Sequence, residues 1–359
     1  MDFNISIPTD TCHLEAAPVI APVIRREILR PIEGNHYLLV LDNSAMEKFT
    51  TCPVAAYNYL CLRRQASAKN SALVFGGAIH QALEVLLLGP SASESPEDFS
   101  LRQDAAIVKH FLENPTPVTD HRTAPLAMQV MKHYRVRQTF PDYEWEIKNK
   151  LVEVPFELPL GVLNVNANIQ LPSWSEPRFV ETVSVAWSGK IDAIAECNSR
   201  VRVVDHKTTS IAGDNFVQDF KLSNQTIGYV WAAQQLFPDL NVTGFCGNAI
   251  HLKKPGASGY GSDLLLKGPR GGDPSLNFFR FYFEYSPERL VQWERNAISL
   301  CSDFVHCLVR NYFPSHTKWC FGKYGRCPYH DACVIDEESV REHFLLSAVF
   351  EPVTWDPTL

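Results

Sequence analysis

Two aspartates and a lysine on neighbouring predicted strands are the residues of this chain best suited to chemistry. Residues 188–207 read as two β-strands joined by a tight turn at Asn198-Ser199, because β-branched residues fill both strands and Asn-Ser is typical of turns. A hairpin centred on that turn places Asp192 directly opposite Asp205. Side chains alternate along a strand, so Lys207 projects on the same face as Asp205. Two carboxylates and a lysine on one face suit a divalent cation and a phosphodiester.

These charges also have a simpler interpretation, as a structural ion pair or as side chains that face water. Ala193-Ile194 and Val203-Val204 make both strands apolar on both faces, as in a buried central sheet. Like charges directly opposite each other on a sheet are destabilising, and a buried charge without a partner costs several kcal/mol. The pattern therefore favours a metal site over an ion pair.

Three further motifs lie around the hairpin in the sequence. Gly77-Ala78-Ile79-His80 precedes it, and Gln225-Thr226-Ile227-Gly228-Tyr229 follows it, with Gln225 and Tyr229 one helical turn apart. Taken alone, His80 could be a hydrogen-bonded residue at a helix start, and Tyr229 could be core packing. The third motif has one early and three late cysteines: Cys52, Cys320, Cys327 and Cys333.

In this order the motifs resemble the PD-(D/E)xK nuclease superfamily, specifically its RecB-like branch. Gly189-Lys190-Ile191-Asp192 and Val203-Val204-Asp205-His206-Lys207-Thr208-Thr209 are similar to the core of that branch, and the resemblance covers about residues 44–335. Its iron–sulfur subset includes CRISPR-adaptation, AddB-type and phage-encoded exonucleases. The resemblance implies an α/β, restriction-endonuclease-like fold, with a mixed central sheet flanked by helices, added N-terminal helices and a C-terminal cysteine-rich segment.

The resemblance implies a metal-dependent DNA exonuclease, a hydrolase of phosphodiester bonds. Asp192 and Asp205 would share Mg²⁺ or Mn²⁺, and the backbone carbonyl of His206 would add a ligand. Lys207 would hold the attacking water or the scissile phosphate. His80 would complete the metal shell, and an imidazole ligand makes such a site more hospitable to Mn²⁺.

Two supporting positions follow from the same resemblance. Gln225 and Tyr229 would contact the DNA backbone or orient Lys207. Glu153, on a predicted strand, could be a further acid near the site, and exposure to solvent explains it equally well.

The cysteine motif implies an iron–sulfur cluster held by Cys52, Cys320, Cys327 and Cys333. Four thiolates hold either Zn²⁺ or [4Fe–4S], and spacing alone does not decide between them. His330 in place of Cys52 would give a Cys₃His zinc site, the main alternative. Either centre would be structural and would join the C-terminal segment to the N-terminal helices.

The composition of the chain bears on its partners and its location in the cell. The 359 residues carry a formal net charge of −7, so we expect modest affinity for long duplexes, or delivery to single-stranded DNA or DNA ends by a partner. That partner would be a helicase, recombination or CRISPR-adaptation protein, since no Walker A motif is present. A homo-oligomer is compatible with the sequence. Without a secretory signal or an apolar run of about 20 residues, we expect a protein of the bacterial or phage-infected cytoplasm that does not enter membranes.

The elements that position these residues follow from periodicity. We expect helices at 99–113, 124–138, 224–237 and 287–312, and a helix that carries His80 and follows Gly76-Gly77. Strands are expected at 144–158, 163–169, 180–197, 200–207, 243–252 and 278–285. The regions would be an N-terminal arm (1–43), a helical region (44–142), the nuclease core (143–315), the cysteine segment (316–335) and a tail (336–359).

Overall fold

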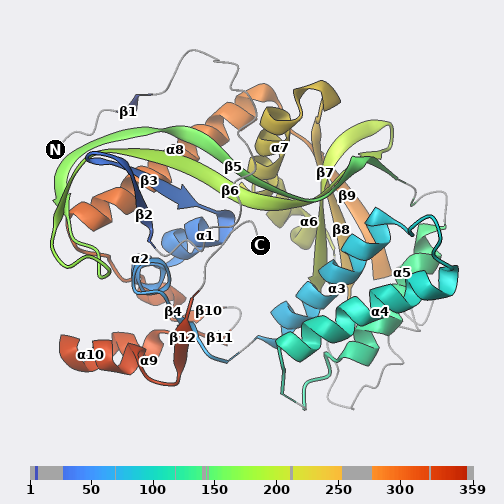
Figure 1. The fold of residues 1–359 in the computed structure, drawn as a ribbon, viewed down its shortest axis with the longest axis horizontal. Coiled ribbons are helices and arrows are strands. Elements are labelled where there is room, and N and C mark those ends of the chain that lie inside the picture. Colours follow the sequence, from blue (N-terminus) through green and yellow to red (C-terminus); the bar gives the residue numbers. More distant parts are fainter. Residues whose placement is uncertain are drawn as a thin grey trace. The chain divides into compact units, whose positions relative to one another are not determined.

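A computed structural model describes residues 5–6, 27–68, 70–117, 119–139, 143, 145–210, 213–252, 277–322 and 325–353 (Figure 1). Its strands are β1 (Ile5–Ser6), β2 (Leu29–Glu33), β3 (His36–Leu41), β4 (Arg64–Ala66), β5 (Glu146–Ile169), β6 (Arg178–Cys197), β7 (Arg200–Thr209), β8 (Gly244–His251), β9 (Phe278–Glu284), β10 (Phe321–Gly322), β11 (Gly325–Arg326) and β12 (Phe350–Pro352). A glycine-rich stretch at 253–275 lies outside the described residues.

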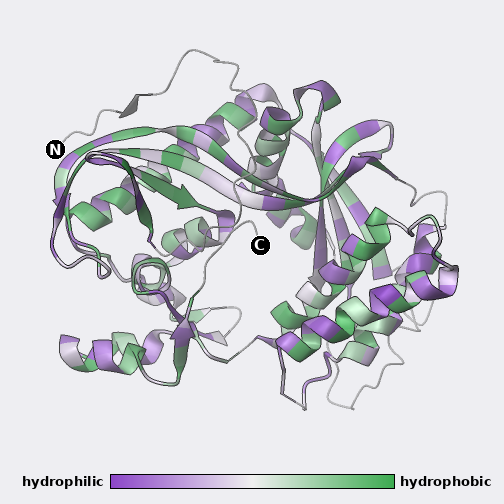
Figure 2. Cartoon of the chain, in the orientation of Figure 1, coloured by the Kyte–Doolittle hydropathy of each residue, from purple (hydrophilic) through white to green (hydrophobic). Residues whose placement is uncertain are grey.

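The helices are α1 (Asn43–Thr51), α2 (Pro53–Ala56), α3 (Ser71–Leu88), α4 (Pro96–Glu113), α5 (Ala124–Gln138), α6 (Asp214–Lys221), α7 (Asn224–Leu236), α8 (Pro287–Val309), α9 (His330–Cys333) and α10 (Glu338–Leu345). A π-helical turn (Tyr57–Cys61) extends α2. Figure 2 shows α4 and α8 banded in green and purple, as expected of helices with one apolar and one polar face.

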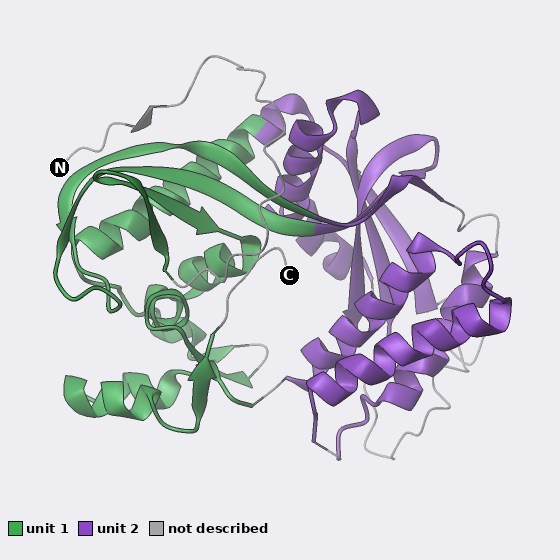
Figure 3. Cartoon of the chain, viewed as in Figure 1, with its two compact units in different colours: residues 1–68, 155–190, 291–359 green, residues 69–154, 191–290 purple. Residues whose placement is uncertain are grey.

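The chain forms two compact units, each made of separate stretches of sequence (Figure 3). Unit 1 contains residues 1–68, 155–190 and 291–359, and unit 2 contains residues 69–154 and 191–290. The five sequential regions expected from the sequence stay a prediction, because these units group residues by packing and not by order along the chain.

The sheet is mixed, as the sequence predicted. In unit 1, β3 runs parallel to the first part of β6 and antiparallel to β2. In unit 2, the end of β6 pairs with β7 antiparallel, β7 with β8 parallel, and β8 with β9 antiparallel. Separately, the short strand β12 pairs with β4 in unit 1.

The predicted hairpin forms with the expected register. Asn198 and Ser199 both have positive φ, 51° and 58°, as a two-residue type I′ turn requires. Cys197 pairs with Arg200, and the ladder continues to Ala193 opposite Val204. The next step of the same register brings Asp192 to the level of Asp205.

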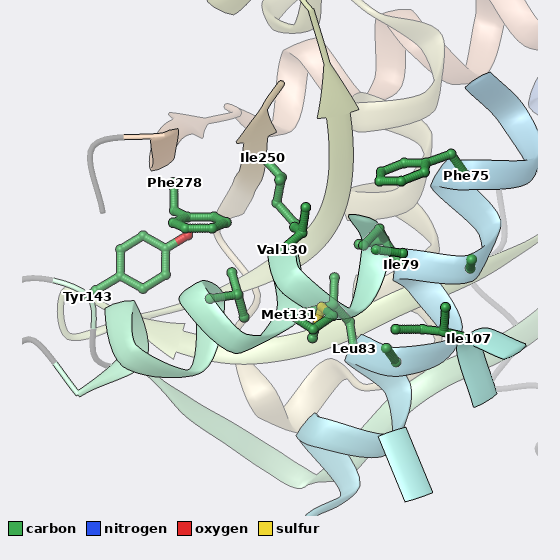
Figure 4. Close-up of a cluster of buried hydrophobic side chains, with 13 residues drawn as sticks. Phe75, Ile79, Leu83, Ile107, Val130, Met131, Tyr143, Ile250 and Phe278 are labelled. Atoms are coloured by element: carbon green, nitrogen blue, oxygen red, sulfur yellow. The ribbon is translucent and has the colours of Figure 1, made fainter. Parts of the chain in front are cut away.

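Helices cover both faces of the unit 2 sheet. On one face, Ile250 of β8 and Phe278 of β9 belong to a buried cluster with side chains of α3, α4 and α5 (Figure 4). On the other face, the Phe281 ring lies 5.9 Å from Phe216 and 5.4 Å from Phe220, both on α6, measured between ring centroids. The predicted helix-flanked sheet is therefore confirmed.

Two sequence predictions about element boundaries are wrong. The strands expected at 144–158 and 163–169 are one strand, β5. It continues through Gly161, where a Cβ would lie 3.6 Å from the side chain of Ile298 on α8, so the glycine allows close packing instead of ending the strand. Helix α3 begins at Ser71, before Gly76-Gly77, and Asn70 caps it by accepting a hydrogen bond from Ala72 N–H at 2.9 Å.

Helix α3 is long and apolar enough to span a membrane, and among the described helices it is the one that meets both conditions. Core helices commonly meet them too. The residues of α3 that are buried in unit 2 include Phe75, Ile79 and Leu83, so we treat it as a core helix.

Candidate active site

Unit 2 brings the predicted chemical residues together from strands β6 and β7 and helices α3 and α7. Strand β6 supplies Asp192, and β7 supplies Asp205, His206 and Lys207. Helix α3 carries His80. Both aspartates are buried, with residue exposures of 7% for Asp192 and 1% for Asp205, so neither is a solvated surface charge. Buried carboxylates need a cation or several hydrogen bonds.

Asp205 and Gln225 hold the ammonium group of Lys207. Lys207 Nζ lies 3.0 Å from Oδ1 and 2.8 Å from Oδ2 of Asp205, and it donates to Oε1 of Gln225 at 3.2 Å. Gln225 Nε2 in turn donates to Asp205 Oδ1 at 3.2 Å. The three side chains form a closed triangle, and Gln225 lies where it can orient Lys207. Tyr229, one turn further along α7, is buried.

His80 lies between Asp192 and the backbone of residue 206. Its Nε2 lies 2.8 Å from the carbonyl oxygen of His206, and its Nδ1 lies 3.5 Å from Asp192 Oδ2. The same Asp192 oxygen accepts a hydrogen bond from the backbone N–H of His206 at 2.7 Å. The backbone of residue 206 therefore contacts both side chains.

Glu153 joins this group, which the sequence left undecided. The ligand atoms of His80, Glu153 and Asp192 all lie within 4.8 Å of one another. Glu153 has a φ of 51°, one of four non-glycine residues of β5 in the left-handed region. Such residues interrupt the regular alternation of a strand and re-aim side chains. Period-two patterning therefore could not place the Glu153 carboxylate.

The shifts in pKa reflect the shared burial of these groups. Burial opposes the charged form of His80, but the Asp192 carboxylate outweighs it and raises the pKa of His80 to about 9. Burial also favours neutral Asp192, yet His80 lowers the pKa of that carboxyl below its usual range. For Asp205, burial and the neighbouring Asp192 charge raise the pKa in spite of Lys207. Burial lowers the pKa of His206 to about 3, so its imidazole is neutral.

This donor set fits a hard divalent cation. Carboxylates from Asp192 and Glu153 and the carbonyl of His206 supply oxygen, the ligand that Mg²⁺ prefers, and His80 adds the nitrogen that Mn²⁺ accepts. Asp205, whose carboxylate contacts Lys207, lies outside the close group of His80, Glu153 and Asp192. A cation would also offset the burial and the Asp192 charge that together raise the pKa of Asp205.

Unit 1 gathers the four cysteines from distant parts of the chain. Cys52 lies between α1 and α2 and its sulfur accepts from the backbone N–H of His316 at 3.5 Å. Cys327 N–H donates to the Cys320 carbonyl at 2.8 Å. Burial raises the pKa of Cys333 to about 11, with contributions from the other three thiols, so the four lie within electrostatic reach of one another.

The cysteine sulfur atoms do not form a group of three as compact as a tetrahedral zinc site. Among the described residues, which include all four cysteines and His330, no three of these groups have ligand atoms all within 4.8 Å of one another. Tetrahedral Zn²⁺ with Zn–S bonds of about 2.3 Å needs sulfur separations of about 3.8 Å. The Nδ1 of His330 instead lies 2.8 Å from Arg326 Nη2.

The chain is similar to one family model and to solved structures. A family model described as "PD-(D/E)XK nuclease superfamily" matches residues 43–334, which include every residue of the site and all four cysteines. One similar solved structure is a protein from Eubacterium rectale described as "Putative exonuclease". It is 11% identical, with a TM-score of 0.42, over 83% of this chain and 88% of that chain. No curated protein matches this chain.

Proposed function

The chain belongs to the PD-(D/E)XK nuclease superfamily, and on that premise we propose that it is a divalent-metal-dependent deoxyribonuclease that degrades single-stranded DNA or DNA ends as an exonuclease. The observation that carries the proposal is the group in unit 2 that joins the buried Asp192 and Asp205 to the half-buried Lys207 and His80. Each of these side chains has a use in phosphodiester hydrolysis, and burying two carboxylates together without such a use would only destabilise the fold.

Residues from β5, β6, β7 and α3 would bind the cation. Asp192, Asp205, Glu153, His80 and the His206 carbonyl would hold Mg²⁺ or Mn²⁺. When bound, such a cation lowers the pKa of a water ligand and neutralises phosphate oxygens.

Lys207 would hold the attacking water or a non-bridging phosphate oxygen. Asp205 and Gln225 fix its ammonium before substrate arrives, so little side-chain entropy is lost during the reaction. Tyr229 is buried on the same face of α7 as Gln225, and it would hold this helix in position beside the DNA backbone.

The alternative is a catalytically silent nuclease-fold subunit that binds DNA or assembles with partners. The complete set of Asp192, Asp205 and Lys207 favours catalysis, since a silent subunit has no need to keep two buried carboxylates beside a lysine.

For the cysteines we propose a structural [4Fe–4S] cluster held by Cys52, Cys320, Cys327 and Cys333. The four thiols influence one another electrostatically in unit 1, and no three of their sulfur atoms lie within 4.8 Å of one another, which supports a centre larger than one tetrahedral Zn²⁺. Anaerobically purified protein should be brown, with a broad visible absorption shoulder that Cys327→Ala removes. A colourless protein with one zinc per chain would reject the cluster. If removing the metal from the cysteines, with the Asp192 site intact, abolished cleavage, the cysteines would hold a catalytic centre.

We further propose that the protein works in the cytoplasm of a bacterial or phage-infected cell, in DNA repair, recombination or CRISPR and phage DNA metabolism. The net charge of −7 supports delivery to DNA by a helicase or another partner, or assembly of several copies around DNA.

Cleavage of labelled DNA tests the central proposal. Linear single- and double-stranded DNA would be labelled at either end and incubated with Mn²⁺ or Mg²⁺, with circular DNA as the control for endonuclease action. We expect stepwise loss of linear DNA, intact circles, and no activity in Asp205→Ala or Lys207→Ala. Cleavage that survives both substitutions would reject the assigned site, and cleavage of circles would make the enzyme an endonuclease.

A further inference from the structure

A row of three polar side chains crosses the unit 2 sheet behind the proposed metal site. His206 of β7 pairs with Asn248 of β8, and Asn248 pairs with Arg280 of β9. Directly paired residues project on the same face, and alternation puts this row on the face opposite Asp205 and Lys207. His206 and Asn248 are 2% and 0% exposed, so solvent cannot satisfy their polar atoms.

Asn248 uses both ends of its amide. Its Oδ1 accepts from the Tyr143 hydroxyl at 2.5 Å and lies 3.5 Å from Arg280 Nε. Its Nδ2 donates to the Tyr134 hydroxyl at 2.8 Å and lies 2.8 Å from His206 Nδ1.

The direction of the Asn248 amide is set by Arg280. A guanidinium can only donate hydrogen bonds, so the amide atom that faces it is the oxygen. Arg280 is itself held between two rings, with its guanidinium carbon 3.7 Å from the Tyr143 centroid and 3.6 Å from the Trp145 centroid. The amide nitrogen must then face His206.

This direction decides which ring nitrogen of His206 carries the proton. Nδ1 faces an N–H donor and has to accept, so the proton lies on Nε2. Nε2 is buried and has no hydrogen-bond partner among the described residues. Two rings lie beside the His206 ring: His80, at 5.7 Å between centroids, and Trp145, at 6.0 Å. The fold thus leaves one donor of His206 unsatisfied and keeps the bond to Asn248.

We propose that Asn248 is a positioning residue for the metal site. It fixes the tautomer and orientation of the His206 ring, and this anchors the backbone of residue 206, whose N–H holds Asp192 and whose carbonyl faces His80. The inference rests on the proposed metal site and adds to it a residue that touches neither metal nor substrate.

The isosteric change Asn248→Asp reverses the bond without changing its size. An oxygen would face His206 Nδ1, which then has to donate, while Tyr134 can adapt because a hydroxyl both donates and accepts. We expect the affinity for Mn²⁺ to fall about 10- to 100-fold, the usual effect of removing a hydrogen-bond partner behind a metal site. The matched control is Gln103→Glu, the same amide-to-acid change at a fully buried residue of α4 that bonds Arg135, and it should leave Mn²⁺ affinity unchanged.

Two measurements on the full-length protein test the inference. Calorimetric Mn²⁺ titration of the wild type, Asn248→Asp, His206→Phe and the double variant gives a double-mutant cycle. If Asn248 acts through His206, its substitution changes affinity less than about twofold once the imidazole is gone. Equal effects in both backgrounds, or wild-type affinity in Asn248→Asp, would overturn the inference.

The second measurement is made on the metal-free protein, so it does not depend on metal binding by any variant. ¹⁵N spectra of ring-labelled histidine, assigned with His206→Phe, should show the Nε2–H tautomer for His206 in the metal-free wild type, and a protonated Nδ1 there would overturn the inference. Failure of the proposed function gives a different result from failure of this inference. If the proposed function is wrong, the wild-type protein will neither cleave DNA nor bind Mn²⁺ in an Asp192-dependent way. The tautomer of His206 can be measured in either case.

Discussion

Metal binding at neutral pH should expel about one proton per ion, and His80 should be its source. The Asp192 carboxylate raises the pKa of His80 to about 9, so in the metal-free protein at pH 7 the imidazole is about 99% protonated. A histidine binds a metal ion only as the neutral ring. The ion therefore competes with a proton that Asp192 holds in place.

The magnitude follows from that pKa. Between pH 7 and pH 9 each unit should raise the affinity for Mn²⁺ about tenfold, which gives about 100-fold in total, and the affinity should level off above pH 9. Because the proton on His80 competes with the ion, the affinity for Mn²⁺ rises with pH. Because the pKa of Asp205 is also raised, binding at acidic pH should release a further proton from that carboxyl.

Calorimetry in buffers of different ionisation enthalpy counts the released protons directly. At pH 7 we expect about one proton per Mn²⁺ for the wild type and close to zero for His80→Asn, whose amide has no proton to lose. The Asn variant should bind more weakly and with little pH dependence between 7 and 9. Wild-type binding without proton release at pH 7, or equal release from both proteins, would refute the assignment of His80 as a ligand paired with Asp192.

Four further predictions follow from the same geometry. The metal-free protein should lose stability as the pH rises from about 6.5 to about 9, because the raised pKa of His80 stabilises the fold only while the ring is protonated; thermal unfolding should show this loss in the wild type and not in His80→Asn. Lys207→Arg should lower the cleavage rate about 100-fold or more with little change in Mn²⁺ affinity, because the planar guanidinium cannot replace the ammonium held by Asp205 and Gln225; near-normal single-turnover cleavage would contradict this. Glu153→Gln should weaken Mn²⁺ binding about tenfold by calorimetry, whereas unchanged affinity would show that the carboxylate lies beside the ion without binding it. Gly77→Ala should destabilise the protein by about 1 kcal/mol in denaturant unfolding, because its Cβ would lie 2.7 Å from the His110 ring; in a His110→Ala background the same change should stabilise by about 1 kcal/mol, and destabilisation in both backgrounds would reject the clash.

The parts of the site that local chemistry determines could be predicted from the sequence. The turn at Asn198-Ser199 and its β-branched strands set the register, and the register aligns Asp192 with Asp205. Family resemblance, and not spacing, brought the distant His80 into the prediction.

Other parts depend on geometry that no local pattern encodes. Glu153 reaches the site through a left-handed backbone in β5. Asn248 lies in the apolar run of β8, and its partnership with His206 depends on a parallel pairing between strands that the chain separates by α6 and α7. Gly76 and Gly77 suggested a helix start, but they lie inside α3 to make room for Thr208 and His110.

The pairing of β12 with β4 has a consequence for how the chain is made on the ribosome. Every stretch of unit 2 has been synthesised by residue 290, whereas β4 must wait for Phe350–Pro352 to gain its partner strand. At ordinary translation rates this delay is on the order of ten seconds, long enough for the sheet around Asp192 and Asp205 to form first. During that time β4 is an open edge on a nascent chain, and its length of three residues limits the pairing it can offer to other chains.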